Sequence, residues 1–195
     1  MTKGFIFKYS ADADDPLLRD KLGTTSICGV GLRDPDFWSN ACPVWAICGP
    51  YYRKALDPGD IVFFVPKQAA LRKAMLDDYV CTGTLVVEEK LPCSEVVMAD
   101  ARLAKEYKKR YKVDLAAHLE TDKARTKKIR SCNFIVGNSS RSKWFGRNEE
   151  YLGAMLQELG IQNVNAKISA RRVPVLSQVD ARSLHNRLSE KTSSA

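Results

Sequence analysis

The strongest constraint on the fold is an uninterrupted apolar run at residues 61–65 (IVFFV), which directly follows the tetrapeptide 57–60 (DPGD). Proline and glycine in such a tetrapeptide favour the backbone angles of a tight turn. A strand with one exposed face alternates apolar and polar residues, whereas this run contains no polar residue. The segment therefore predicts a turn followed by a strand that is buried on both faces.

Shorter patterns predict further elements around this strand. Strands are expected at 4–9, 44–48, 79–87, 132–137 and 171–176, the last at a sheet margin because it contains Pro174. Helices are expected at 16–22, 68–77, 94–118, 151–159 and 180–190, and Gly160 supplies a stop for the fourth. Because strands and helices do not alternate regularly, a doubly wound sheet is disfavoured. We expect an α+β fold with a small mixed or antiparallel β-barrel that carries helical insertions.

Composition indicates one folded domain, or at most two, and we expect a single domain at 1–190 with a frayed tail at 191–195. The chain has 195 residues, of which 45% are hydrophobic and 28% charged, which is enough to form a core without disulfides. No apolar run approaches the roughly 18 residues that span a bilayer, and the N-terminus turns acidic early. We therefore expect a cytoplasmic protein that does not engage a membrane.

The sequence offers little for metal or cofactor chemistry. Six cysteines, at positions 28, 42, 48, 81, 93 and 132, form no Cys-x-x-Cys pair, and both histidines, His118 and His185, lie in helical contexts. Phosphate-loop, zinc-protease and serine-elbow motifs are absent, and the fragment 29–31 (GVG) precedes no long amphipathic helix. We expect no metal and no cofactor, and buried thiols at positions 28, 81 and 132.

Positive charge is concentrated in the middle of the chain. Residues 1–100 carry 11 basic and 14 acidic side chains, 101–130 carry 11 and 4, and 131–195 carry 9 and 5. Concentrated positive charge attracts polyanions and releases counterions from phosphates, so nucleic acid is the first partner to consider. The alternative is a solvated basic helix without a partner. We expect a basic helical insertion at 93–130.

Seven basic residues of this insertion are candidate contacts to a phosphate backbone. Four lysines recur at spacings of three or four and so share a broad helical face, and three further cations follow. These residues are Lys105, Lys108, Lys109, Lys112, Lys127, Lys128 and Arg130. Tyr107 and Tyr111 are expected on the packed side of the helix. Cations placed in this way would position a nucleic-acid backbone without reading its sequence.

Two segments resemble a known family. In residues 35–66, an aromatic run precedes Cys42 and is followed by the pattern Ala46-x-Cys48-x-Pro50. Arg53 and Gly59-Asp60 come later in the same segment. Residues 137–148 (GNSSRSKWFGRN) form a polar loop and an aromatic-Phe-Gly run after a predicted strand. These features resemble nucleotide-modification-associated domain 2, a family related to PUA-like domains such as EVE and ASCH. The resemblance covers 5–92 and 131–159, with Gly49 in place of a basic residue.

The resemblance implies a PUA-like barrel with a pocket for a base or nucleotide, in systems that make or recognise modified bases. Aromatic rings could stack on such a base, polar groups could bind its edge, and a cation beside a helix N-terminus could hold a phosphate. The candidate pocket residues are Phe37, Trp38, Cys48, Gly49, Pro50, Arg53, Asn138, Ser139, Ser140, Trp144, Phe145 and Arg147. In the alternative interpretation Trp45 is a core residue, Trp144 and Phe145 pack against the following helix, and Asn148 only caps that helix.

Three functions stay open. The first is a domain that binds nucleic acid or a nucleotide and captures a base, which we expect to be a modified one. The second is an enzyme on a nucleotide or nucleic acid that uses Asp36, Asp60 or Cys48, although Asp60 is also explained by its turn. The third is an interaction subunit of a larger defence or modification complex, with the basic helices as a protein-docking surface.

Overall fold

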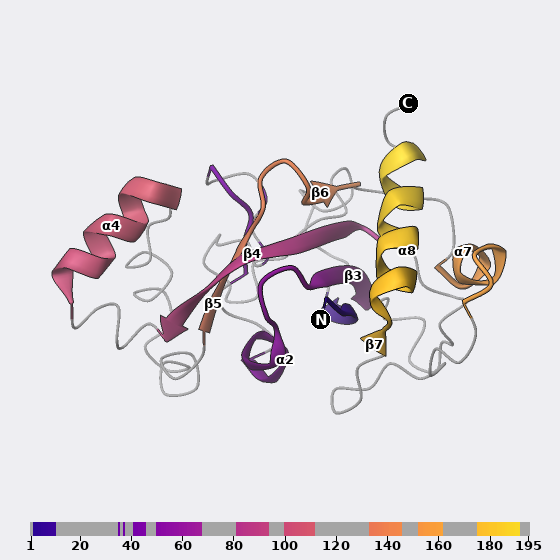
Figure 1. Ribbon diagram of the computed structural model, residues 1–195, viewed down its shortest axis with the longest axis horizontal. Coiled ribbons are helices and arrows are strands. Elements are labelled where there is room, and N and C mark those ends of the chain that lie inside the picture. The colour runs from indigo at the N-terminus through magenta and orange to yellow at the C-terminus, as the bar shows by residue number, and fades with distance from the viewer. Residues whose placement is uncertain are drawn as a thin grey trace. The chain divides into compact units, whose positions relative to one another are not determined.

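A computed structural model describes residues 2–10, 35, 37, 41–45, 50–67, 81–93, 100–111, 133–145, 152–161 and 175–191 (Figure 1). The chain divides into two compact units. The first unit comprises Met1–Gly23, Gly59–Val86 and Lys143–Ala195, and the second comprises Thr24–Pro58 and Val87–Ser142. The single domain expected at 1–190 stays a prediction, as does the frayed tail at 191–195.

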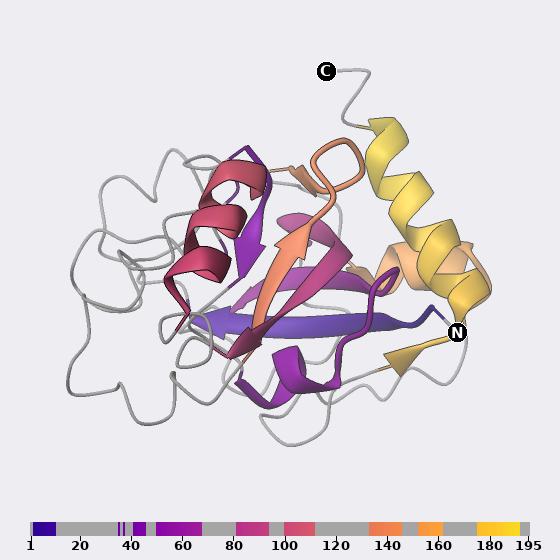
Figure 2. The ribbon, with the colours of Figure 1, turned by 60° about the vertical axis from the view of Figure 1, so that its left-hand side comes forward.

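The first unit is built on β1 (Gly4–Ser10) and β3 (Ile61–Lys67), which run parallel and side by side (Figure 2). The start of β4 (Gly83–Cys93) pairs antiparallel with β3, and β7 (Val175–Leu176) pairs antiparallel with β1. The short strand β6 (Lys143–Trp144) pairs with the first residues of β4. The strands predicted at 4–9 and 61–65 are confirmed, and β7 confirms a marginal strand within 171–176.

The turn predicted at 57–60 is confirmed, and it sets the register of β1 against β3. Gly59 has a φ of 93°, in the left-handed region that favours glycine. Asp60 is buried and accepts a hydrogen bond from the Lys3 amide through Oδ1 at 2.7 Å. The Ile61 amide donates to the Lys3 carbonyl at 2.9 Å. The turn therefore ties the start of β3 to the residue before β1.

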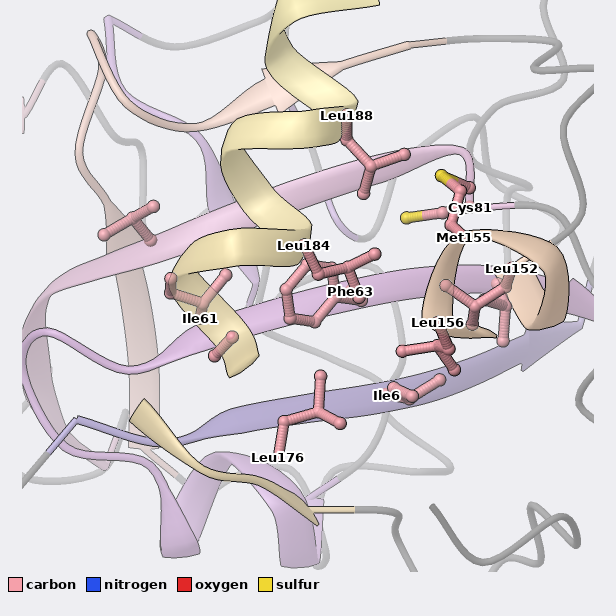
Figure 3. Close-up of a cluster of buried hydrophobic side chains, with 13 residues drawn as sticks. Ile6, Ile61, Phe63, Cys81, Leu152, Met155, Leu156, Leu176, Leu184 and Leu188 are labelled. Carbon is pink, nitrogen blue, oxygen red and sulfur yellow. The ribbon is translucent and has the colours of Figure 1, made fainter. Parts of the chain in front are cut away.

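Two helices cover one face of this sheet and form the core of the first unit (Figure 3). They are α7 (Leu152–Glu158) and α8 (Gln178–Lys191). Alternate residues of β3 point toward them, and Phe63 lies beneath Leu184 of α8. The full cluster comprises Ile6, Ile61, Phe63, Val65, Cys81, Val86, Leu152, Met155, Leu156, Leu176, Ala181, Leu184 and Leu188.

The intervening residues of β3 are buried as well. Val62 and Phe64 are fully buried, and the rings of Phe7 and Phe64 meet edge to face with their centroids 6.0 Å apart. An edge-to-face contact suits two aromatic quadrupoles. The expectation that residues 61–65 are buried on both faces is therefore confirmed.

The second unit is built on β5 (Asn133–Gly137), which pairs antiparallel with the end of β4 on one side and with β2 (Val44–Trp45) on the other. It also contains α2 (Pro50–Ala55) and α4 (Ala101–Tyr111). Trp45 lies opposite Ile135, and both are fully buried. Trp45 is therefore a core residue, as the alternative interpretation expects, because a fully buried indole is not accessible to a ligand.

The strand pairings give a mixed sheet of order β2-β5-β4-β3-β1-β7, with β6 also paired to β4. Its end strands, β2 and β7, do not pair with each other in the described part of the chain. The expected mixture of helices and mixed strands is confirmed as an open seven-stranded sheet. The helices expected at 16–22 and 68–77 lie outside the described residues.

The expected end of the strand at residue 87 is wrong, because β4 continues to Cys93. Residues 88–93 (EEKLPC) carry little strand preference of their own, but β5 pairs with them and supplies their hydrogen bonds. The register shifts between Leu91 and Cys93, which places Pro92 at an irregularity where its missing N–H is tolerated.

Proline at position 50 begins a helix that the sequence pattern does not predict. Pro50 stands in the first turn of α2, where its missing N–H costs nothing and its fixed φ suits the helix. The helix α8 also begins earlier than expected, at Gln178. Ser177 caps it, since its Oγ accepts from the Asp180 amide at 3.2 Å and donates to the Asp180 carboxylate at 2.7 Å.

Candidate nucleic-acid interface

The helix α4 separates its cations from its apolar residues. Arg102, Lys105, Lys108 and Lys109 are exposed, whereas Leu103, Ala104 and Tyr107 are half-buried. The predicted packed side is confirmed for Tyr107. Arg102 belongs to the same exposed side although the lysine spacing does not single it out. We call Arg102, Lys105, Lys108 and Lys109 the cationic face of α4.

Both ends of α4 are held by acidic residues. Asp100 caps the N-terminus, because its Oδ1 accepts from the amides of Arg102 at 2.9 Å and Leu103 at 3.2 Å. Near the C-terminus, Arg110 forms an ion pair with Glu89 of β4, with 3.4 Å between Nη1 and Oε2. The cap satisfies amides of the first turn, and the ion pair links the last turn to β4.

The tyrosine on the packed side lies in the field of the same carboxylate. Burial raises the pKa of the Tyr107 hydroxyl above its ordinary value, and the carboxylates of Glu89 and Glu106 raise it further. The Arg110 guanidinium acts in the opposite direction. Tyr107 therefore stays neutral at physiological pH and adds no negative charge to the interface.

The polar loop after β5 is held by one amide side chain. Asn138 Oδ1 accepts from the Ser140 amide at 3.2 Å, the Ser140 hydroxyl at 2.8 Å and the Arg141 amide at 2.9 Å. Its Nδ2 donates to Glu88 at 2.6 Å. Asn138 therefore orders the loop rather than presenting its amide to a ligand, whereas Ser139 and Ser140 are exposed at its tip.

Trp144 and Phe145 are half-buried parts of the first unit. A Cβ atom added to Gly83 would lie 2.6 Å from the Trp144 ring and 3.2 Å from the Lys143 carbonyl oxygen. Glycine at the first position of β4 therefore allows the close approach of Trp144. Phe145 packs against the hydrophobic cluster, and its amide donates to the Thr82 carbonyl at 2.8 Å. Phe145 therefore packs against a cluster that includes α7, as the packing alternative expects, whereas the sequence pattern did not anticipate that Trp144 lies against β4.

Arg53 is a described candidate pocket residue that lies inside the second unit. Its side chain is fully buried, and Nη1 donates to the carbonyl oxygen of Asn133 at the start of β5. Lys90 of β4 stabilises the same helix by donating to the carbonyls of Lys54 at 2.7 Å and Leu56 at 2.9 Å. Arg53 thus joins α2 to β5 inside the second unit, where it is not exposed to a ligand.

The remaining candidates divide between described and undescribed residues. Phe37 is half-buried and, like Pro50, Arg53 and the loop 138–140, belongs to the second unit. The positions outside the described residues are Trp38, Cys48, Gly49, Arg147, Lys112, Lys127, Lys128 and Arg130, together with Asp36 and Asn148. Their predicted roles stay predictions.

Burial disfavours the thiolate form of the two described free cysteines, Cys42 and Cys81. Burial raises the pKa of Cys81 to about 12, despite opposing backbone hydrogen bonds, so this thiol stays protonated. Burial, reinforced by Glu88, also raises the pKa of Cys42. The Asp60 carboxylate accepts a hydrogen bond from the Lys3 amide. The burial predicted for Cys81 is confirmed, and Asp60 has a structural role.

The described residues contain neither a metal-binding cluster nor a membrane-spanning helix. Among them, no group of three or more His, Cys, Asp or Glu side chains is placed to hold a metal ion. No helix in the described ranges is both long enough and apolar enough to cross a bilayer. Comparison of the chain with protein-family models, curated proteins and solved structures finds no significant match.

Proposed function

We propose that this protein binds nucleic acid or a nucleotide, and that the cationic face of α4 contacts the phosphates. The observation that carries the proposal is the arrangement of α4, where the four cations of this face are exposed and Leu103, Ala104 and Tyr107 are half-buried. A helix rises 1.5 Å per residue, so Arg102 to Lys109 extends about 10 Å, which corresponds to about three base-pair rises of 3.4 Å along a duplex axis. The geometry supports contact with a backbone rather than with base edges.

Base capture is the second part of the proposal, and it rests on the two segments that resemble the PUA-like family. In this proposal the bound nucleotide is a modified one, the fold closes into a PUA-like barrel, and the protein acts in the cytoplasm. Of the candidate residues, Ser139 and Ser140 are exposed at the tip of an ordered loop, where they could bind a base edge. The packing of Trp144, Phe145 and Arg53 favours supporting roles for these three.

The cationic face is tested by the triple variant Lys105→Gln, Lys108→Gln and Lys109→Gln. Loss of three phosphate contacts is expected to reduce the slope of log K against log salt on a duplex by about 2.7 and to weaken binding at low salt by on the order of 10- to 100-fold. Fluorescence anisotropy with a labelled 20-base-pair duplex at several salt concentrations measures both quantities.

A matched control removes the same number of charges elsewhere. Lys3, Lys54 and Arg182 are exposed and lie outside α4. Their combined replacement by glutamine should change the slope by less than about 0.9, the value for a single phosphate contact. Equal weakening by both triple variants would show that only net charge matters and would contradict a localised interface. Circular dichroism of both variants checks that the fold is retained.

Base capture is tested by titrating the protein with matched oligonucleotides that contain cytosine, 5-hydroxymethylcytosine, adenine or N6-methyladenine. We expect tryptophan quenching that depends on the modification and persists at high salt, because stacking on an aromatic ring is less screened than phosphate contacts. Quenching that ignores the base and disappears with salt would contradict the pocket and leave only backbone binding.

The two other functions predict different results. An enzyme would convert a nucleotide or oligonucleotide that is incubated with the purified protein. A docking subunit would retain a protein partner after nuclease treatment, whereas an interface held by nucleic acid would not. Among the described residues, no specific contact favours either of these over binding.

A further inference from the structure

The cations of α4 are not equivalent in their positions around the helix. At 100° per residue, Arg102, Lys105 and Lys109 fall within an arc of about 60°, and Lys108 flanks this arc on one side. Arg110 falls about 80° from Arg102 on the opposite flank, next to the half-buried residues. This position brings Arg110 to β4, where Glu89 lies.

The contact between Arg110 and Glu89 is close but remains partly in water. Nη1 and Oε2 are 3.4 Å apart, and the side chains are 59% and 30% exposed. Glu89 also acts on Tyr107, three residues before Arg110 on the same helix. The carboxylate therefore lies against the last turns of α4, beside the cationic face. Because Arg110 is already paired with a carboxylate, a phosphate that binds it must first displace Glu89.

We propose that Glu89 is an intramolecular competitor for the phosphate backbone, which occupies Arg110 and so keeps a fifth cation out of the interface. This inference rests on the proposed function of the α4 face and adds its regulation. A carboxylate and a phosphate oxygen are both anionic acceptors for a guanidinium, so the two compete for the same donor. Nucleic acid bound to the wild-type protein would thus be held by the cationic face alone, without Arg110.

The variant Glu89→Gln tests this role directly. Loss of the competing carboxylate should make the salt slope on a duplex steeper by about 0.9 and should tighten binding by about two- to fivefold. The double variant Glu89→Gln with Arg110→Gln should return to the wild-type slope, because the pair contributes no net contact. Lys109→Gln, which removes a cation of the face, should make the slope shallower by about 0.9.

A matched control uses the ion pair between Glu158 of α7 and Arg187 of α8, which are 3.0 Å apart and partly exposed. Glu158→Gln makes the same change in net charge on a different helix and should leave the slope at the wild-type value. An unchanged slope in Glu89→Gln, or an equal gain in Glu158→Gln, would overturn the competitor role while leaving phosphate binding intact. Absence of duplex binding by the wild-type protein at low salt would instead overturn the proposed function, and the competitor role with it.

Discussion

Replacement of Arg53 by alanine is expected to lower the free energy of unfolding by about 3 to 5 kcal/mol. The side chain is fully buried, and its guanidinium donates to the Asn133 carbonyl. Alanine would leave a cavity between α2 and β5 and would remove a donor from a buried acceptor. Urea denaturation monitored by circular dichroism measures this loss of stability. The denaturation midpoints are compared provided that the variant and the wild type share the same denaturant slope m.

The neighbouring residue on the same helix provides the control. Lys54 is exposed, and Lys54→Ala should change stability by no more than about 0.5 kcal/mol. Arg53→Lys keeps the charge but not the planar donor group. It should therefore lower the free energy of unfolding by less than Arg53→Ala and by more than Lys54→Ala. If Arg53→Ala were as stable as wild type yet failed to bind a modified oligonucleotide, Arg53 would be a ligand contact and its structural role would be wrong.

Replacement of Phe63 by alanine should also cost about 3 to 5 kcal/mol, because a large aromatic side chain is lost from a packed core. Phe63 is fully buried on β3 beneath α8 (Figure 3). The cavity would lie between the sheet and the helix that covers it, so α8 should lose protection first. Thermal unfolding together with amide hydrogen exchange of α8 measures both effects.

Two variants bracket this result. Phe63→Leu retains most of the apolar volume and should cost clearly less than alanine. Val179 is 72% exposed in the first turn of α8, so Val179→Ala tests the helix without disturbing the core and should be near neutral. A loss below about 1 kcal/mol for Phe63→Ala would contradict the packing of α8 on β3.

The candidate site was predictable from sequence only where a helical period carried the signal. The spacing of Lys105, Lys108 and Lys109 predicts a shared face, and the structure exposes all three. The position of Arg53 could not be predicted, because its partner Asn133 is 80 residues away in the chain. The ion pair of Glu89 with Arg110 is likewise a contact between separate elements, so no local pattern signals it.

Strands, turns and helix ends that are signalled by a few neighbouring residues could be predicted from the amino-acid sequence. Residues 61–65 carry their own burial pattern, and Gly59 and Gly160 occupy left-handed positions that glycine favours. Three features depend instead on long-range contacts: the extension of β4 to Cys93, the inward position of Arg53 and the ion pair of Glu89 with Arg110. A turn or an apolar period is stabilised within a few residues, whereas a strand end, a buried cation and an ion pair need partners from distant parts of the chain.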